Sequence, residues 1–394
     1  MSSTVFYPLA ANGADYPRPL VSLLPQPSWA AWCARSGPHM ESPFLSGGES
    51  FTHSRYALAE AMRRAGVGPC GAVWLPAFHC RTMVEPALYL DAEVLYYPLT
   101  PDLQPNFEVV AERMKSGVKG VAMLLTHYFG FPNAVEESAQ FCKAQGLVLI
   151  EDCAHALYGQ VGAHRLGKIG KYAAASLWKF LPVRDGSVLL DNTMSQPNPR
   201  RALSRPIGAE LKALAGLIES WVKKRRSHWS PPATAVLNVE ARRILARGSG
   251  AIPEGGLKEF SPASADLPAF ALSRWLSVFA AHGLVAQKRR ENYQRWLLGV
   301  QSIPGIAPLF PELPATVVPY AFPLLIDAEG LLFHALKLAG IPIWRWEDIA
   351  VTECAVAQDY RLRLLQLPCH QELSKQELEW LIQTVQALAR EVLK

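Results

Sequence analysis

One lysine of this chain stands in an unusually apolar stretch. Lys179 lies in the segment AAASLWKFLPV, between Trp178 and Phe180. Because an ammonium is costly to place among apolar groups, such a lysine has a lowered pKa and is available as a nucleophilic free amine. The alternative is a surface lysine whose charge reaches solvent along its aliphatic stem. The small and apolar neighbours favour the reactive amine.

An acidic pair ends a predicted strand upstream of this lysine. The segment LVLIEDCAHALYG is apolar up to Glu151 and Asp152, and His155 follows three residues later. Asp152 could be a helix cap and His155 a hydrogen-bonded core residue. The functional interpretation is a buried carboxylate that holds a cation, such as a protonated ring nitrogen. That carboxylate and a lysine for a Schiff base are what pyridoxal 5'-phosphate (PLP) needs from a protein.

A phosphate site should accompany such a pair. The segment THSRYAL places Ser54 and Arg55 at the start of a predicted helix, where free amides and the helix dipole favour an anion. Ser176, three residues before Lys179, offers a hydroxyl nearby. Each signal is common in proteins, but together with Asp152 they predict one PLP site.

The elements that must position these residues alternate along the chain. Short apolar segments predict strands within 71–80, 92–99, 120–130 and 147–159, and helical periodicity predicts helices within 50–66, 81–91, 106–117 and 134–146. Thr52 or Ser54 is expected to cap the first helix. This alternation is typical of an α/β fold with a mainly parallel sheet flanked by helices. Ligands bind such sheets beyond the carboxyl ends of the strands, which is where Asp152 falls.

Three regions follow from the pattern. We expect an N-terminal lead-in over 1–43, a large PLP-binding domain over 44–300 and a small C-terminal α+β domain over 301–394. Residues 195–262 interrupt the large domain as a basic, partly helical insertion, with 12 Lys/Arg against 5 Asp/Glu. A helical pattern follows it over 265–300.

Composition narrows the class of protein. The seven cysteines are scattered and none forms a CxxC pair, which indicates reduced thiols without a disulfide framework or zinc site. The N-terminus lacks a basic start followed by an apolar run, so we expect no signal peptide. No apolar run approaches the roughly 20 residues that cross a bilayer. We therefore expect a cytoplasmic protein without a membrane partner.

From about Phe44 to Asn192 the chain resembles the DegT/DnrJ/EryC1/StrS aminotransferases, fold-type-I PLP enzymes that aminate keto-sugars. SRYALAEAM resembles the phosphate-loop helix, LIEDCAHALYG the aspartate motif, and GKIGKYAAASLWKFLPVRDGSVLL the lysine motif. VWLPAFHCRTMVEPAL and THYFGFP resemble the turns that flank the cofactor. The C-terminal segments VPYAFPLLID, LAGIPIWRW and LPCHQEL resemble the family's small domain.

The resemblance implies a role for each candidate residue. Lys179 would form the internal aldimine and carry the proton, Asp152 would contact the pyridine nitrogen, and His155 would lie near the phenolic oxygen. The phosphate would be held by Ser176, Ser54 and Arg55. A residue of the PAFHC turn would stack on the ring, as Phe78, His79 or Cys80. The implied activity is transfer of an amino group from an amino-acid donor to a keto-sugar or related carbonyl, by a homodimer with active sites near the subunit interface.

The chain also departs from the family pattern. Ser176 stands three residues before the lysine, where the family commonly has a serine five before it, and FLPVRDGS replaces a Gly-rich run. The family's Asn-Tyr-Arg run, which supplies a partner-subunit contact, is not evident. These differences leave the phosphate contacts open.

Substrate residues are expected from the segment IPIWRWED. Arg345 could bind a carboxylate or phosphate while Trp344 stacks on a sugar ring. In the structural alternative, the tryptophans belong to the core and Arg345 to a salt bridge. His127, after the strand at 120–130, is a further candidate.

Other interpretations remain open. PLP also serves decarboxylases, lyases and aldolases, and the fold does not choose among them. The basic insertion, with WVKKRRSHW, could instead serve non-catalytic binding to nucleic acid, anionic lipid or a partner, although solvated charge runs are more common. The glycines of VGAHRLGKIGKY lack the spacing of a dinucleotide loop. His53, His79, His127 and His155 lack the close spacing of a metal site, so none is predicted.

Overall fold

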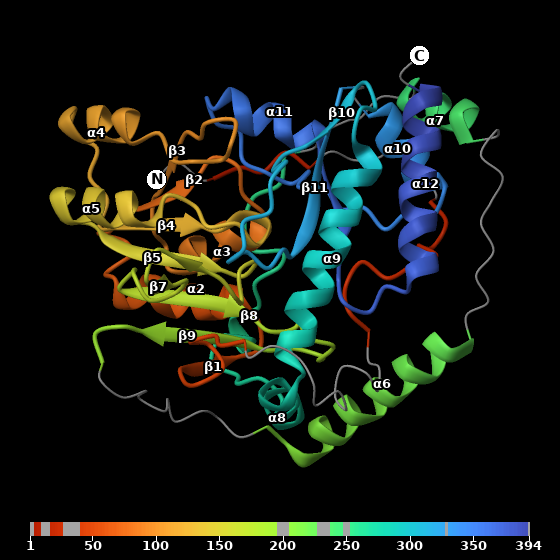
Figure 1. Ribbon diagram of the computed structural model, residues 1–394. Coiled ribbons are helices and arrows are strands. Elements are labelled where there is room, and N and C mark those ends of the chain that lie inside the picture. The colour runs from red at the N-terminus through yellow and green to blue at the C-terminus, as the bar shows by residue number, and fades with distance from the viewer. Residues whose placement is uncertain are drawn as a thin grey trace.

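A seven-stranded sheet forms the centre of the molecule (Figure 1). The computed structural model describes residues 4–8, 16–26, 40–194, 205–226, 237–246, 253–327 and 330–392. The strands of the central sheet are β1 (Glu49–Phe51), β2 (Val73–Pro76), β3 (Val94–Tyr97), β4 (Ala122–Thr126), β5 (Val148–Cys153), β8 (Tyr172–Ser176) and β9 (Ser187–Asp191). A hairpin of β6 (Gln160–Val161) and β7 (His164–Arg165) lies between β5 and β8 in sequence.

Most of this sheet is parallel. The strand order is β1-β9-β8-β5-β4-β2-β3, and the five strands from β8 to β3 pair in parallel, whereas β9 pairs antiparallel with β8 and with β1. Both β4 and β8 are buried along their whole length, as expected for strands covered on both faces. The carboxyl ends of β2, β4, β5 and β8 therefore meet at one edge, and the mainly parallel sheet that the sequence predicts is confirmed.

Helices connect these strands as predicted. They are α2 (Ser54–Arg64), α3 (Arg81–Tyr89), α4 (Phe107–Lys115) and α5 (Val135–Gln145). The prediction of the first cap was wrong, because the N-cap of α2 is His53, and its side chain makes no capping hydrogen bond. Helix α2 packs on β8 and β9, and so its first turn lies at the edge where the parallel strands end.

A second, antiparallel sheet of three strands organises the C-terminal part. It consists of β10 (Ile306–Pro308), β11 (Ala321–Ile326) and β12 (Leu364–Pro368), with α10 (Leu331–Leu338), α11 (Ala355–Arg363) and α12 (Lys375–Val392). This is the predicted small α+β unit. The preceding helix α9 (His282–Val300) packs against α12, β10 and β11 of this unit (Figure 1).

The helical pattern over 265–300 forms two helices, α8 (Ala271–Phe279) and α9. The chain turns extended at Ala280, whose φ and ψ are −62° and 150°. The two helices bury different faces: α9 buries Tyr293 and Trp296 completely, while Trp275 and Phe279 of α8 are 58% and 61% exposed. One straight helix could not bury the aromatic residues of α9 in the core and at the same time leave those of α8 on the surface.

The predicted insertion contains two described helices. Helix α6 (Ile207–Arg226) extends along the lower edge of the view in Figure 1, and α7 (Leu237–Ala246) packs on α10. The predictions for 195–204, 227–236 and 247–252 lie outside the described residues. Of the predicted lead-in, residues 4–8, 16–26 and 40–43 are described, and Phe6 bridges to Glu254 and Ala350. Within the described part of the chain, no helix has the length and apolar character needed to cross a membrane.

Candidate functional site

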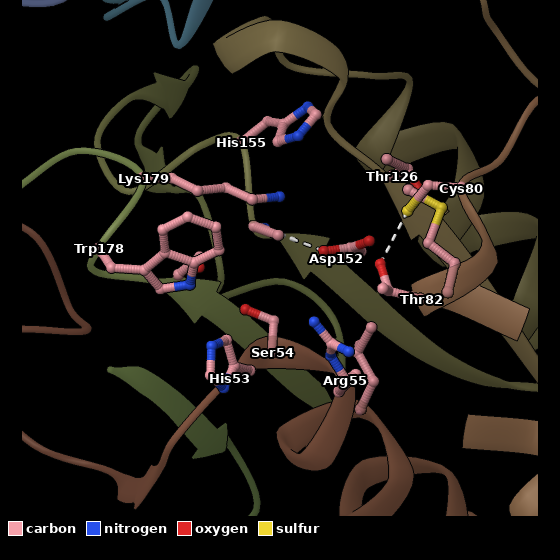
Figure 2. Close-up of a pocket in the computed structure, with 14 residues that line it drawn as sticks. His53, Ser54, Arg55, Cys80, Thr82, Thr126, Asp152, His155, Trp178 and Lys179 are labelled. Atoms are coloured by element: carbon pink, nitrogen blue, oxygen red, sulfur yellow. Dashed lines mark hydrogen bonds between the residues drawn. The ribbon is translucent and has the colours of Figure 1, made fainter. Parts of the chain in front are cut away.

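A cavity opens at the edge of the central sheet where its parallel strands end (Figure 2). Its walls come from the ends of β4, β5 and β8, the turns after β2 and β8, and the start of α2. The predicted site residues that line it are Lys179, Asp152, His155, Ser176, Ser54, Arg55 and Cys80. Ser54 and Lys179, more than a hundred residues apart in sequence, therefore line the same cavity at the edge where the parallel strands end.

Lys179 is held by its backbone in the turn after β8. The amides of Phe180 and Leu181 donate to the carbonyl of Leu177, and the guanidinium of Arg289 donates to the carbonyl of Lys179 over 3.0 Å. This turn leaves the side chain free to point across the cavity toward Asp152 (Figure 2). Burial lowers the pKa of Lys179, against the opposing effect of nearby Cys80 and Asp152. This shift favours the free amine and has the direction that the sequence context predicts.

Asp152 ends β5 at the floor of the cavity. Its side chain is 1% exposed, and its Oδ1 accepts a 2.9 Å hydrogen bond from the amide of Ala154. Burial raises the pKa of this carboxyl, and the Ala154 amide and Lys179 act in the opposite direction. A cationic N–H placed against the carboxylate would stabilise its charged form in this setting.

His155 is packed flat between aromatic rings. Its ring stacks on Tyr320 with centroids 4.2 Å apart, and Phe129 lies 5.8 Å away on a nearly parallel plane. Burial, and then the charge of Lys179, hold the pKa of His155 well below its ordinary value. The imidazole is therefore neutral, and no described residue forms a hydrogen bond with its buried Nδ1.

The opposite end of the cavity is lined by the start of α2. Ser54 lies in the first turn, and its Oγ lies 3.1 Å from Ser187 Oγ, whose hydrogen goes to the carbonyl of Ala175. Arg55 forms an ion pair with Glu259 at 3.1 Å. Burial lowers the pKa of His53 to about 4, with contributions from neighbouring cations, so this N-cap residue adds no positive charge near pH 7.

A larger hollow of about 250 Å³ adjoins this cavity and shares Lys179, His155 and Cys80 with it. Trp344 lines it and is 45% exposed, as a substrate-contacting indole requires. Arg345 also lines it, but its guanidinium pairs with Glu347 at 2.9 Å and lies 3.7 Å from the Phe333 ring centroid. These contacts fit the structural alternative for Arg345.

Three predicted residues lie away from both hollows. Phe78 packs on Trp346 with centroids 4.9 Å apart, and its carbonyl accepts from the Tyr128 hydroxyl. His79 is fully buried and accepts from the amide of Ala350. Of the three candidates in the PAFHC turn, the cavity is lined by Cys80 alone, because the turn directs the other two side chains into the core.

His127 is likewise not at the cavity. Its Nε2 lies 3.1 Å from Glu151, and its Nδ1 accepts from the amide of Asn133. The strand places its side chain on the buried side of the sheet edge, so the proposed contact with substrate has no support from its position.

Ligand atoms of His127, Glu151 and Cys153 lie within 4.8 Å of one another, as a metal site would require. Both nitrogens of His127 are already engaged. Glu151 accepts from the amides of Gly167, Ile169 and Gly170 as well as facing the imidazole. This network accounts for the ligand atoms without an ion, and the prediction of no metal stays a prediction.

Three residues of the site escaped the sequence reasoning. Arg289 is completely buried and donates to the carbonyls of Lys179, Pro319 and Tyr320, which fastens the lysine turn to the C-terminal unit. Tyr320 supplies the ring under His155, and Lys179 Nζ lies 5.6 Å from its centroid. Trp178 lines both hollows. Nothing in the sequence around Arg289, which lies in a helical pattern, indicates such a role. Trp178, by contrast, is adjacent to Lys179 and could have been proposed from the sequence.

Comparison with known proteins finds that part of the chain is similar to aminotransferases. Residues 50–185 match the model of the DegT/DnrJ/EryC1/StrS aminotransferase family. A stretch of 125 residues is 32% identical to the dTDP-4-dehydro-2,3,6-trideoxy-D-glucose 4-aminotransferase of Saccharopolyspora spinosa, and covers 31% of this chain and 32% of that protein. The chain thus spans about a third of the length of the curated relatives it matches.

Solved structures agree over a longer range. The aminotransferase TlmJ from Streptoalloteichus hindustanus superposes with a TM-score of 0.61 at 21% identity, over 88% of this chain and 86% of that one. The sugar aminotransferase Spr1654 from Streptococcus pneumoniae in its PLP form gives 0.60 at 16% identity, over 91% and 94%. These likenesses confirm the predicted fold class, that of fold-type-I PLP-dependent transferases. The resemblance read from the motifs is confirmed over residues 50–185, which match the model of the DegT/DnrJ/EryC1/StrS aminotransferase family.

Proposed function

We propose that this protein is a PLP-dependent aminotransferase that moves an amino group from an amino-acid donor to a keto-sugar or related carbonyl acceptor. One observation carries the proposal: a lysine with a lowered pKa and a buried aspartate face the same cavity. The family match supports the reaction class, and the printed activity of the Saccharopolyspora spinosa relative supports the acceptor class.

The polar atoms of the cavity fit the cofactor. Four buried atoms have no hydrogen-bond partner among the described residues, although their residues line one cavity: Thr126 Oγ1, His155 Nδ1, Ser176 Oγ and Trp178 Nε1. Buried polar groups are rarely left unpaired, because each costs about 1–3 kcal/mol in that state. Four in one cavity indicate a polar ligand that the site is shaped to hold.

PLP, when bound, supplies a reactive aldehyde and a ring that accepts electrons. Lys179 Nζ would hold the aldehyde carbon, and Asp152 would hold the proton on the ring nitrogen. Ser176 and the first turn of α2 would face the phosphate, and Cys80 would lie against the ring. His155, neutral and fixed by Tyr320, offers its Nδ1 to a polar atom of the ring.

Lys179 can serve in two roles at different times. Burial lowers the pKa of Nζ and so favours the free amine, which can bond to an aldehyde as a nucleophile. When a donor amine has displaced it, the same free Nζ can take a proton from the substrate carbon and return it as a general base and acid. Arg289 holds the backbone of Lys179 in place throughout, so that only the side chain has to move.

The substrate would enter through the larger hollow. Its described wall combines the exposed face of Trp344 with arginines that are already paired, such as Arg81 with Asp348 at 3.0 Å. An indole face suits the apolar side of a sugar ring. Trp178 and Tyr320 form parts of the wall beside Lys179, which is half-buried.

We also propose a homodimer. Trp275, Val278 and Phe279 expose an apolar surface on α8. This helix is joined to the lysine segment, since the amide of Phe270 donates to the carboxylate of Asp185. A second copy covering α8 would therefore lie near the active site.

A single half-reaction tests the proposed function. The PLP-loaded protein is mixed with L-glutamate without an acceptor, and the cofactor and products are then quantified. We expect one equivalent of pyridoxamine phosphate and of 2-oxoglutarate per site, and none from Lys179→Ala. Release of carbon dioxide or ammonia with the cofactor unchanged would instead indicate a decarboxylase or lyase.

A further inference from the structure

The segment that links β8 to the catalytic lysine is short, and it carries two unpaired hydrogen-bond groups. Ser176 ends β8 and is 1% exposed, yet its Oγ has no hydrogen-bond partner in the described part of the chain. Trp178, two residues later, has a buried Nε1 that likewise finds no partner there. Both residues line the smaller cavity together with Lys179. Nothing in the family resemblance assigns a role to the tryptophan.

The indole restricts what can occupy this end of the cavity. An indole N–H is a donor and never an acceptor, so its partner must present an acceptor atom. His53 packs edge-on against this ring, with centroids 5.8 Å apart and planes at 71°, which fixes the orientation of the indole. In Figure 2 the Nε1 of Trp178 is directed toward the side of the cavity where Ser54 lies.

The wall opposite the indole also offers donors. The amides of Ser54 and Arg55 open α2 and have no acceptor within the helix. Those of Tyr56 and Ala57 donate to the carbonyl of the N-cap residue His53, whose side chain makes no capping bond. The Ser187 hydroxyl donates its single hydrogen to the carbonyl of Ala175 at 2.7 Å, so the Ser54 hydroxyl, 3.1 Å away, donates to Ser187 and adds no donor while that bond is made. Asp152 is the single acidic residue among the described residues that line this cavity, and it lies at the end of β5. Donors from two segments thus converge without a competing carboxylate, which suits a phosphate group.

We infer that Trp178 is a cofactor-binding residue, whose indole N–H donates together with the Ser176 hydroxyl to the phosphate of PLP. This inference rests on the proposed function. The tryptophan would compensate for the shortened segment, in which a serine three residues before the lysine replaces one five residues before it. It acts as a positioning residue because it fixes the phosphate end and thereby the aldehyde beside Lys179.

The test compares two aldehydes that differ in the phosphate alone. Apoprotein is titrated with PLP and with pyridoxal, and the dissociation constants are taken from the visible absorption band. In Trp178→Phe, which keeps the aromatic ring but loses the N–H, we expect about tenfold weaker PLP binding, the loss typical of one hydrogen bond to a charged group. Pyridoxal binding should be unchanged. Inorganic phosphate should compete with PLP for the wild-type apoprotein and less well for the variant.

Controls separate the possible outcomes. Trp344→Phe removes an indole N–H from the larger hollow and should keep the wild-type ratio of PLP to pyridoxal affinity. If Trp178→Phe does not fold, as judged by circular dichroism and thermal melting, Ser176→Ala decides, with the same expected loss for PLP. A wild-type ratio in the folded variant would overturn the role of the indole and leave the aminotransferase intact. Failure of the wild-type protein to bind either aldehyde would overturn the proposed function, and this inference with it.

Discussion

At the scale of single residues, the proposed function depends on how burial changes the pKa of Lys179 and of Asp152. Burial lowers the pKa of Lys179 and raises the pKa of Asp152, so it favours the neutral form of both side chains. For the lysine this is useful, because the free amine is the reactive species. For the aspartate it is a cost that a bound cation would offset. The pair is therefore better suited to the loaded site than to the isolated protein.

The lowered pKa of Lys179 gives a pH prediction. Desolvation disfavours the ammonium, so the folded protein releases this proton at a lower pH than the ordinary value of 10.5. Labelling of the apoprotein by a neutral acylating reagent should follow the free amine and rise with pH to a plateau. We expect the midpoint for Lys179, measured by peptide mass spectrometry, to lie below 10.5. The exposed Lys115 serves as the reference for reagent decay. A midpoint at or above 10.5 would contradict a desolvated amine.

Sequence reasoning identified these residues because their signals are local. Each signal lies within about a dozen consecutive residues: a lysine among apolar neighbours, and a carboxylate at the end of a strand. Side-chain direction within a turn is not, which is why Phe78 and His79 were candidates although Cys80 alone of that turn lines the cavity. The hydrogen bond from Arg289 to the carbonyl of Lys179 joins residues 110 positions apart, and the pattern of apolar residues does not predict it.

At the scale of elements, the lysine strand is positioned by a buried carboxylate. Glu151 is completely buried at the end of β5 and accepts from the amides of Gly167, Ile169 and Gly170 in the segment that leads into β8. Its Oε2 also lies 3.1 Å from His127 Nε2. Burial alone would raise the pKa of Glu151, but the His127 contact and the glycine amides outweigh it, and the pKa is lowered.

Glu151→Gln tests this element. The amide retains a single acceptor oxygen and turns an NH₂ group toward backbone donors, so we expect a loss of about 3 kcal/mol in the free energy of unfolding at pH 7. Because the folded pKa lies below the ordinary 4.5, the wild-type stabilisation is complete above that pH and is lost as the pH falls through the folded value. Urea unfolding should therefore show the difference between the two proteins shrinking in acid.

The control for this experiment is Glu137→Gln, in the exposed first turn of α5. It should cost about 0.5 kcal/mol or less through the helix dipole. Equal stability of Glu151→Gln and wild type at pH 7 would show that the carboxylate does not hold the lysine strand.

The element pattern itself was largely predictable. The alternation of short apolar strands with amphipathic helices predicts a parallel sheet. Parallel neighbours need a long crossover connection, usually a helix, and these helices then cover both faces of the sheet. The sequence was less informative where two environments meet within one apolar run. The break at Ala280 follows from α8 and α9 burying different faces, a property of the assembled fold.

At the scale of the whole molecule, the apolar surface on α8 is the feature that the described contacts leave unexplained. Trp275 and Phe279 contact each other at 5.0 Å between centroids, yet each is more than half exposed. Exposed apolar patches of this kind commonly mark protein interfaces.

The double variant Val278→Asp/Phe279→Asp tests whether α8 forms the proposed dimer interface. Placing two carboxylates on this surface should make burial against a second copy unfavourable. We expect a dimeric wild-type protein and a monomeric variant by size-exclusion chromatography with light scattering. Leu298→Asp changes an even more exposed residue on α9 and should remain dimeric. A monomeric wild type, or a dimeric double variant, would exclude α8 as the interface.

The central claim is that Lys179 carries PLP, and chemical trapping tests it most directly. Purified protein is incubated with PLP, treated with borohydride and digested, and the peptides are mapped by mass spectrometry. The account predicts loss of the visible absorption band on reduction and a phosphopyridoxyl group on the peptide that contains Lys179. Recovery of an unmodified Lys179 peptide from protein saturated with PLP, or a label on another lysine, would contradict it.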